Sequence, residues 1–152
     1  MTFDFIEKRR GPEAEWFWFP FADNDDFNPT WWSHRSLYGE SRYSLLEVRS
    51  DGLEVARIEL DTEVTFDHYL GTPHLDGTAL EIQLIEVAAS QRRRGIGTKV
   101  LHALATRYPE RRLVASSDEA EGFWASLGWT RFDRQKDAQL SHFLFMQAEP
   151  RA

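Results

Sequence analysis

The spacing of hydrophobic residues changes along the chain and marks out its elements. Two β-compatible runs, Tyr43–Arg49 and Leu53–Leu60, are separated by Ser50-Asp51-Gly52, which predicts a hairpin. The apolar content of Ala79–Ala89 predicts a third strand, buried on both faces. Beyond Gly97 the spacing becomes helical, and this predicts a helix ending before Pro109 with an apolar stripe at Val100, Leu101, Leu104 and Ala105.

The last third of the chain predicts a further strand, a helix and two closing strands. The strand is Leu113–Ala115, and Ser116 with Glu119 has the spacing of a capping box. The helix is expected to run to Leu127 and to stop at Gly128, with the closing strands at Thr130–Asp133 and Ser141–Ala148. This order predicts a mixed α/β (α+β) domain around one sheet. Residues 12–32 are expected to be irregular or in short helices.

Length and composition narrow the class of protein. The 152 residues suggest one domain, 1–152, and the absence of Cys excludes disulfides and thiolate metal sites. No apolar run is long enough to span a membrane and no signal peptide is evident, so we expect a cytoplasmic protein. A net charge of −7 makes nucleic acid an improbable partner. The charge is uneven, −9 over residues 1–76 and +2 over residues 77–152, which permits a cationic ligand on one half and an anionic ligand on the other.

The segment Glu81–Thr98 carries the clearest chemistry. A buried strand enters a turn with Gly95 and Gly97, and a helix follows. Free N–H groups at a helix start, glycines that allow close approach, and three arginines together favour pyrophosphate binding. Neither the P-loop pattern nor the dinucleotide fingerprint fits, since the latter needs glycine at Val100. On the glycines alone, a solvated basic turn is an equally good interpretation.

Two motifs together resemble the GNAT superfamily of acetyl-CoA-dependent N-acetyltransferases. The run Arg92–Gly97 matches that family's Q/R-x-x-G-x-G/A element after a strand and before a helix. About twenty residues later, where the family carries N-x-x-A-x-x-F-Y-x-x-x-G-F, the same register holds Ser117, Ala120, Phe123, Trp124, Gly128 and Trp129. The resemblance covers roughly residues 79–132, and it implies a single mixed, mostly antiparallel sheet flanked by helices, with a splayed central strand pair.

The resemblance also implies where the ligands lie. The half 79–149 would bind acetyl-CoA as co-substrate, and the half 1–78 would form most of the acceptor side. The strand backbone would pair with the pantetheine arm and the turn would hold the pyrophosphate. The residues this assigns to acetyl-CoA are Ile85, Val87, Arg92, Arg93, Arg94, Gly95, Ile96, Gly97, Thr98, Ser117 and Trp124.

One departure from the family concerns the leaving thiolate. The family's Tyr, often the acid that protonates the thiolate, is Trp124 here, and an indole N–H does not release a proton near neutral pH. Another group, water, or unassisted departure of the thiolate must take over that step. Four tyrosines are unranked candidates: Tyr38, Tyr43, Tyr69 and Tyr108.

Amine acetylation also needs a base, because an ammonium must lose a proton before it attacks. Glu81 lies eleven residues before Arg92, the spacing of the catalytic glutamate in histone-type members of the family. Burial in an apolar strand would raise its pKa toward neutrality. Glu86 is the second candidate, while a solvent-facing Glu81 without a catalytic role stays open.

The acceptor side is the least specified. Residues 15–40 and the loop Asp61–Thr78 are expected to recognise a cationic amine, with Trp31, Trp32 and His34 as candidate contacts. The histidine spacing gives no metal motif, so no metal is expected. The interpretation is a direct-transfer N-acetyltransferase, monomeric or homodimeric. A non-catalytic acyl-CoA sensor and an aromatic-rich protein-interaction module are the alternatives.

Overall fold

The fold is one seven-stranded mixed sheet with few helices. It is seen in a computed structural model that describes residues 1–9, 19–33, 42–75, 77–117, 120–136 and 142–149. The elements are β1 (Asp4–Lys8), α1 (Pro29–Ser33), β2 (Tyr43–Ser50), β3 (Leu53–Asp61), β4 (Ala79–Val87), a 3-10 turn (Ala89–Gln91), α2 (Ile96–Arg107), β5 (Arg112–Ser117), α3 (Glu121–Ser126), β6 (Thr130–Phe132) and β7 (Phe143–Met146).

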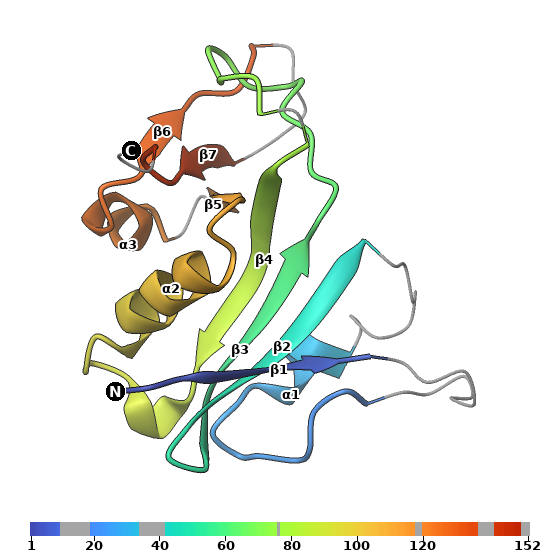
Figure 1. The fold of residues 1–152 in the computed structure, drawn as a ribbon, viewed down its shortest axis with the longest axis vertical. Helices are drawn as coiled ribbons and strands as arrows, with labels where there is room; N and C mark the ends of the chain where they lie inside the picture. The colour runs from blue at the N-terminus through green and yellow to red at the C-terminus, as the bar shows by residue number, and fades with distance from the viewer. Residues whose placement is uncertain (10–18, 34–41, 76, 118–119, 137–141, 150–152) are drawn as a thin grey trace. The chain divides into compact units, whose positions relative to one another are not determined.

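The strands follow the order β1-β2-β3-β4-β5-β7-β6 (Figure 1). Strand β4 pairs with β5 in parallel, whereas β1 with β2, β5 with β7, and β6 with β7 pair antiparallel. Strands β2 and β3 are joined by the two-residue turn Asp51-Gly52. Both turn residues have positive φ, 52° and 80°, as a tight hairpin turn requires. The predicted hairpin and the mixed sheet are therefore confirmed.

Strand β1 was not predicted from the hydrophobic pattern, whereas α1 lies at the end of residues 12–32, where short helices were expected. Strand β1 is mostly polar. It is held in place by its antiparallel pairing with β2 and by an ion pair between Lys8 and Glu47 at 3.5 Å. Helix α1 follows Asn28, whose side-chain oxygen accepts the Thr30 N–H at 3.0 Å, as an N-terminal cap does. Pro29 is then the first helical residue, where its missing N–H costs nothing.

The predicted capping box is wrong. Ser116 belongs to β5, where it pairs with Leu144, and helix α3 begins only at Glu121. The Ser117 hydroxyl oxygen instead accepts the Ala120 N–H at 3.0 Å. Glu119 lies outside the described residues. The helix ends at Ser126, and Gly128 adopts φ 77° with its N–H on Ala125 O, which confirms its role as the C-terminal stop.

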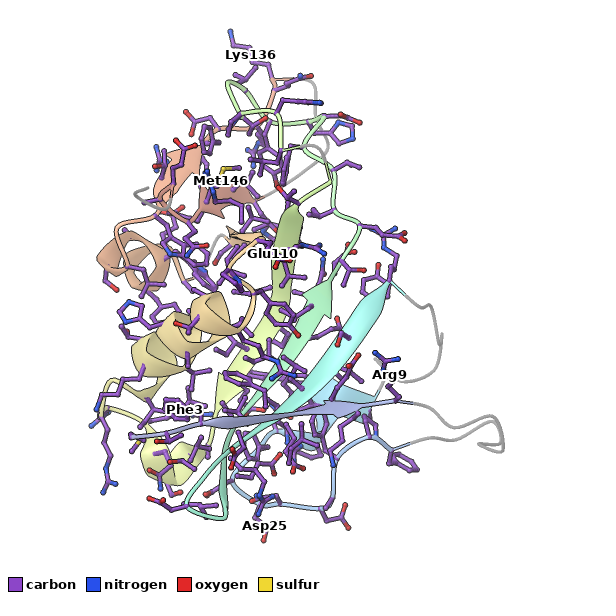
Figure 2. All side chains as sticks on the ribbon, viewed as in Figure 1. Phe3, Arg9, Asp25, Glu110, Lys136 and Met146 are labelled. Atoms are coloured by element: carbon purple, nitrogen blue, oxygen red, sulfur yellow. The ribbon has the colours of Figure 1, made fainter. Side chains whose placement is uncertain are left out.

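The chain forms two compact units, and each has its own apolar cluster. The first unit consists of residues 1–60 and 84–103, and its cluster contains Phe21, Trp32 and Leu45 with Leu84 packed against them. The second unit consists of residues 61–83 and 104–152. Its cluster contains Val114, Leu144 and Met146, the last labelled on β7 in Figure 2.

Candidate functional site

Strand β4 keeps part of its backbone free of a strand partner on the β5 side. The parallel pairing with β5 covers Ala79, Leu80 and Glu81 only, although β4 continues to Val87. Beyond Glu81, no β5 partner exists for β4 within the residues that the structure describes. The predicted pantetheine-binding residues, Ile85 and Val87, lie on this segment and are half-buried. Such a segment can accept an added extended ligand through its main-chain groups.

The turn after β4 presents the start of a long helix. Arg93 and Gly95 adopt left-handed φ angles of 66° and 71°, and α2 begins at Ile96. A Cβ at Gly95 would meet nothing within 4 Å, so glycine is needed there for its backbone conformation rather than for space. The first α-helical bond runs from Lys99 N–H to Gly95 O at 3.1 Å. The earlier N–H groups of the helix, including those of Gly97 and Thr98, have no intrahelical acceptor and favour an anion.

The three arginines of the turn differ in what they contact. Arg92 turns back: its Nε–H donates to Val87 O at 3.2 Å, and its guanidinium meets Glu86 Oε2 at 3.4 Å. Arg93 and Arg94 are exposed and form no ion pair within the described part of the chain. Two cations are therefore available to a phosphate beside the free N–H groups, and the third anchors the turn to β4.

Glu86, the second candidate base, has both carboxylate oxygens occupied. It is only 3% exposed. The Trp32 indole N–H donates to Oε1 at 2.8 Å, the Asn28 backbone N–H lies 3.2 and 3.0 Å from Oε1 and Oε2, and Arg92 meets Oε2. A general base needs a lone pair directed at the substrate. These contacts favour a positioning role, in which Glu86 joins α1 to the glycine turn.

Glu81, the first candidate base, is also buried, but its side-chain contacts differ from those of Glu86. It is 8% exposed, and the Gln83 side-chain amide donates to its Oε1. Burial, with a smaller contribution from the Glu81 charge, raises the pKa of Tyr69, while Arg134 acts to lower it. Tyr69 therefore stays protonated at neutral pH and can donate a hydrogen bond or a proton. Of the other candidate tyrosines, Tyr38 lies outside the described residues.

Trp124, the residue that replaces the family's Tyr, is buried in an aromatic cluster of the second unit. It is 4% exposed, stacks on Trp129 with ring centroids 5.0 Å apart, and meets the edge of Phe123. Its indole N–H is buried and has no acceptor among the described residues. Ser117, the other coenzyme candidate from this motif, holds Ala120 N–H.

A pocket of about 390 Å³ lies in the first unit, in the segment 19–33. Of the candidate acceptor contacts, Trp32 lines this pocket, whereas Trp31 is 46% exposed and is not among the lining residues. His34 lies outside the described residues. A second pocket of about 650 Å³ lies in the second unit, in the 61–78 loop beside Tyr69 and His74. Both predicted acceptor segments thus contain a pocket.

Sequence reasoning missed the ion pair beneath the first pocket. Arg57 and Glu54 on β3 are both buried, and their charged groups meet at 2.9 Å. The Arg57 guanidinium also donates to Ala22 O at 3.0 Å and lies over the rings of Phe21 and Phe27. The available signal was two opposite charges inside a strand otherwise rich in apolar residues, because buried charges are almost always paired.

The described residues contain neither a metal-binding cluster nor a helix that could span a membrane. No group of three or more metal-ligating side chains is close enough to hold an ion there. No helix in that part of the chain has the length and apolar character to cross a membrane.

Comparisons with known proteins identify the family. A model described as "Acetyltransferase (GNAT) domain" matches residues 66–150, which is 85 of the 152 residues. No curated protein matches the chain.

Among solved structures, an acetyltransferase from Thermus thermophilus is 17% identical with a TM-score of 0.53, over 74% of this chain and 68% of its own. AAC(6')-Ib in complex with ribostamycin and coenzyme A is 18% identical with a TM-score of 0.54, over 74% and 67%. GCN5 from Tetrahymena is 14% identical with a TM-score of 0.54, over 74% and 72%. At these identities the structures show the shared fold, and the family match covers more than half of the sequence. The chain belongs to the GNAT acetyltransferase family.

Proposed function

We propose that this protein is an N-acetyltransferase that moves the acetyl group of acetyl-CoA to an amine by direct attack. The observation that carries the proposal is the continuous strand, turn and helix from Ile82 to Arg107. It combines a strand backbone without a partner on the β5 side, two left-handed turn residues and a free helix start in one segment. That combination suits a ligand with an extended amide-containing arm and a pyrophosphate.

Each part of acetyl-CoA would meet a different part of this segment. The backbone at Ile85 and Val87 would pair with the pantetheine arm, which would share the Val87 carbonyl oxygen with the Arg92 Nε–H. The N–H groups of the turn, with Arg93 and Arg94, would hold the pyrophosphate. Binding both ends fixes the thioester beside β4, so that the amine meets it as a neighbour rather than by random collision.

The proposed reaction moves two protons off the nitrogen. Glu81 takes the first from the ammonium and passes it to solvent, and the neutral nitrogen attacks the thioester carbonyl, so that a C–N bond forms. As the C–S bond breaks, the nitrogen loses its second proton, the thiolate gains one from a neighbouring acid that the second proton restores, and CoA leaves as the free thiol. Tyr69 is a protonated phenol with Glu81 among the charges that act on it, which makes it the first of the four tyrosines to test for that donation.

Acetyl-CoA binding and thioester consumption test this proposal in two steps. Acetyl-CoA should raise the melting temperature by an amount that grows with its concentration. Release of free thiol, followed with a chromogenic thiol reagent, should then require an added amine. The absence of any stabilisation by acetyl-CoA would contradict the proposal.

A second candidate function rests on Trp124. An indole in place of the family's phenol removes the usual proton donor, which favours a sensor that binds acyl-CoA without turnover. The same two measurements separate the candidates. A sensor would be stabilised by acetyl-CoA and would release no thiol with any amine, whereas an enzyme releases thiol in proportion to amine acetylated.

A further inference from the structure

The pocket in segment 19–33 has aromatic walls. Phe21, Phe27 and Trp32 are buried, and Phe21 meets Trp32 edge to face with ring centroids 5.2 Å apart. Phe19 also lines the pocket and is 69% exposed, so one aromatic ring remains open to solvent. A volume of about 390 Å³ is near the lower end for small-molecule sites, so it suits a compact ligand.

The charges around this pocket are unbalanced. Asp23 and Asp25 both line it and are exposed, and neither forms an ion pair within the described residues. Asp25 lies at the outer end of the loop (Figure 2). Between them, the Asn24 amide donates to Glu54 Oε1 at 3.1 Å and its backbone oxygen accepts Phe27 N–H. The loop is therefore held in place, with two free carboxylates on its surface.

Arg57, the one cation that lines the pocket among the described residues, already forms an ion pair with Glu54. Glu54 neutralises its charge through bonds of 2.9 and 3.1 Å, and Ala22 O accepts another of its protons. It also lies 4.6 and 4.1 Å from the ring centroids of Phe21 and Phe27. A ligand carboxylate would find no free cation here, and Arg57 already covers the Phe21 and Phe27 rings that a second ligand cation would use.

The same pocket is hydrogen-bonded to β4 and to the 3-10 turn that follows it within the first unit. Trp32, a wall of the pocket, donates to Glu86 of β4. Asp26 accepts Ala89 N–H through its backbone oxygen at 2.9 Å, and its carboxylate accepts the Ser90 hydroxyl. The loop before α1 and the 3-10 turn after β4 are thus fastened together (Figure 1). An amine in this pocket is held by the elements that would carry acetyl-CoA.

We propose that this pocket is the acceptor site and that it selects a compact primary amine carrying an aryl or branched alkyl group and no carboxylate. This inference rests on the proposed acetyltransferase function. Asp23 and Asp25 attract the ammonium as it approaches, and the aromatic walls then hold the apolar group, so that the nitrogen is left free to meet the thioester. A hydroxyl-rich aminoglycoside would leave polar groups unpaired against these rings. A polyamine's second ammonium would find Arg57 already lying over the Phe21 and Phe27 rings.

An amine panel tests the selectivity. The panel is 2-phenylethylamine, phenylalanine amide, phenylalanine, spermidine and kanamycin, each assayed for thiol release at saturating acetyl-CoA. We expect the first two to have the highest kcat/KM, and phenylalanine, which differs from its amide by the carboxylate, to be at least about tenfold worse. Preference for phenylalanine, spermidine or kanamycin would overturn the inference while leaving the acetyltransferase function intact.

The charge-removing variant D23N/D25N tests the pocket itself. Exposed charge interactions of this kind are each worth about 1.4- to fivefold, so the KM for 2-phenylethylamine should rise by roughly two- to twentyfold with kcat little changed. Its dependence on ionic strength should also weaken. The matched control is D133N, an exposed aspartate of the second unit, which should leave KM unchanged. An unchanged KM in D23N/D25N would overturn the inference.

Binding distinguishes failure of the pocket from failure of the function. If no amine in the panel is acetylated, the proposed function fails, and the pocket is judged by thermal shift alone. In that case 2-phenylethylamine must stabilise the unmodified protein and D133N more than D23N/D25N. Equal shifts in all three proteins, or none, would overturn the pocket assignment as well.

Discussion

Replacing Glu86 by glutamine removes a charge from the centre of a hydrogen-bonded network. Glutamine keeps one acceptor oxygen, which can hold the Trp32 indole N–H now bonded at 2.8 Å. The second oxygen becomes an NH₂ group that faces two donors, the Asn28 N–H and the Arg92 guanidinium. Three donor groups then compete for one acceptor in a buried site.

The magnitude follows from those contacts. Loss of the charged bond to the half-buried Asn28 N–H costs about 1.5–3 kcal/mol. The Arg92 side chain is half-exposed, so its ion pair adds at most about 1 kcal/mol. We therefore expect Glu86→Gln to lower the free energy of unfolding by about 2–3 kcal/mol, or the melting temperature by roughly 5–10 °C for a chain of this size.

Urea unfolding followed by far-ultraviolet circular dichroism measures this difference. The control is Glu110→Gln, the same change at an exposed position, labelled in Figure 2, which should stay within about 0.5 kcal/mol of the unmodified protein. A Glu86→Gln protein as stable as the control would refute the reasoning that this carboxylate holds the turn to α1.

The pH dependence of turnover separates positioning from base catalysis. A positioning Glu86 leaves the acidic limb of the kcat/KM profile in place when it is replaced by glutamine, while the KM values for acetyl-CoA and amine rise. A base at Glu81 requires that Glu81→Gln removes that limb. Loss of the limb in Glu86→Gln and its retention in Glu81→Gln would reverse the two assignments.

Three further changes probe other parts of the structure. The folded protein holds the pKa of Tyr69 above its ordinary value of 10.0. The stability that this shift contributes is complete below pH 10 and is lost as the pH rises through the raised pKa. Tyr69→Phe should therefore flatten the alkaline fall in melting temperature. Gly95→Ala forces a side chain into left-handed φ, so it should lower the free energy of unfolding by about 1–2 kcal/mol and weaken acetyl-CoA binding, measured by calorimetry. The control is Gly122→Ala in α3, which introduces no strain and should be neutral or stabilising by up to about 1 kcal/mol. Arg57→Met leaves the Glu54 charge buried without its partner and should lower the free energy of unfolding in urea by about 3–5 kcal/mol. Adding Glu54→Gln should recover most of that loss. No recovery would show that the lost contacts with the aromatic rings dominate.

The fold was largely predictable because most elements carry local signals. Asp51-Gly52 specifies a tight turn, and the apolar stripe of α2 specifies a helix whatever the rest of the chain does. Strand β1 has no such signal: its residues are mostly polar, and its partner is β2, some forty positions away. The capping-box prediction failed because Ser116 is a residue of β5 and pairs with Leu144 of β7. This pairing with a residue distant in the sequence overrides the local motif.

The candidate site was predictable where function depends on backbone shape. Gly95 is needed for a left-handed φ, and that requirement is visible in the sequence as a glycine between a strand and a helix. The roles of Glu81 and Glu86 could not be separated in that way, because both are acidic residues of one strand. The difference lies in what each contacts, and the Asn28 and Trp32 donors come from more than fifty positions away. For the Glu54–Arg57 pair the sequence shows two opposite charges in one strand, but their burial, which makes the pairing necessary, is seen only in the structure.

The short pairing of β4 has a consequence for how the protein behaves in solution. From Ile82 onward, β4 has the character of an edge strand although it lies in the middle of the strand order. Exposed strand edges are templates on which other chains add and aggregate. Gln83 and Glu86 interrupt the apolar residues there, in the manner of natural protection against such growth. A coenzyme arm seated on that edge would serve as a cap as well as a reactant, so we expect concentrated protein to self-associate less when acetyl-CoA is present.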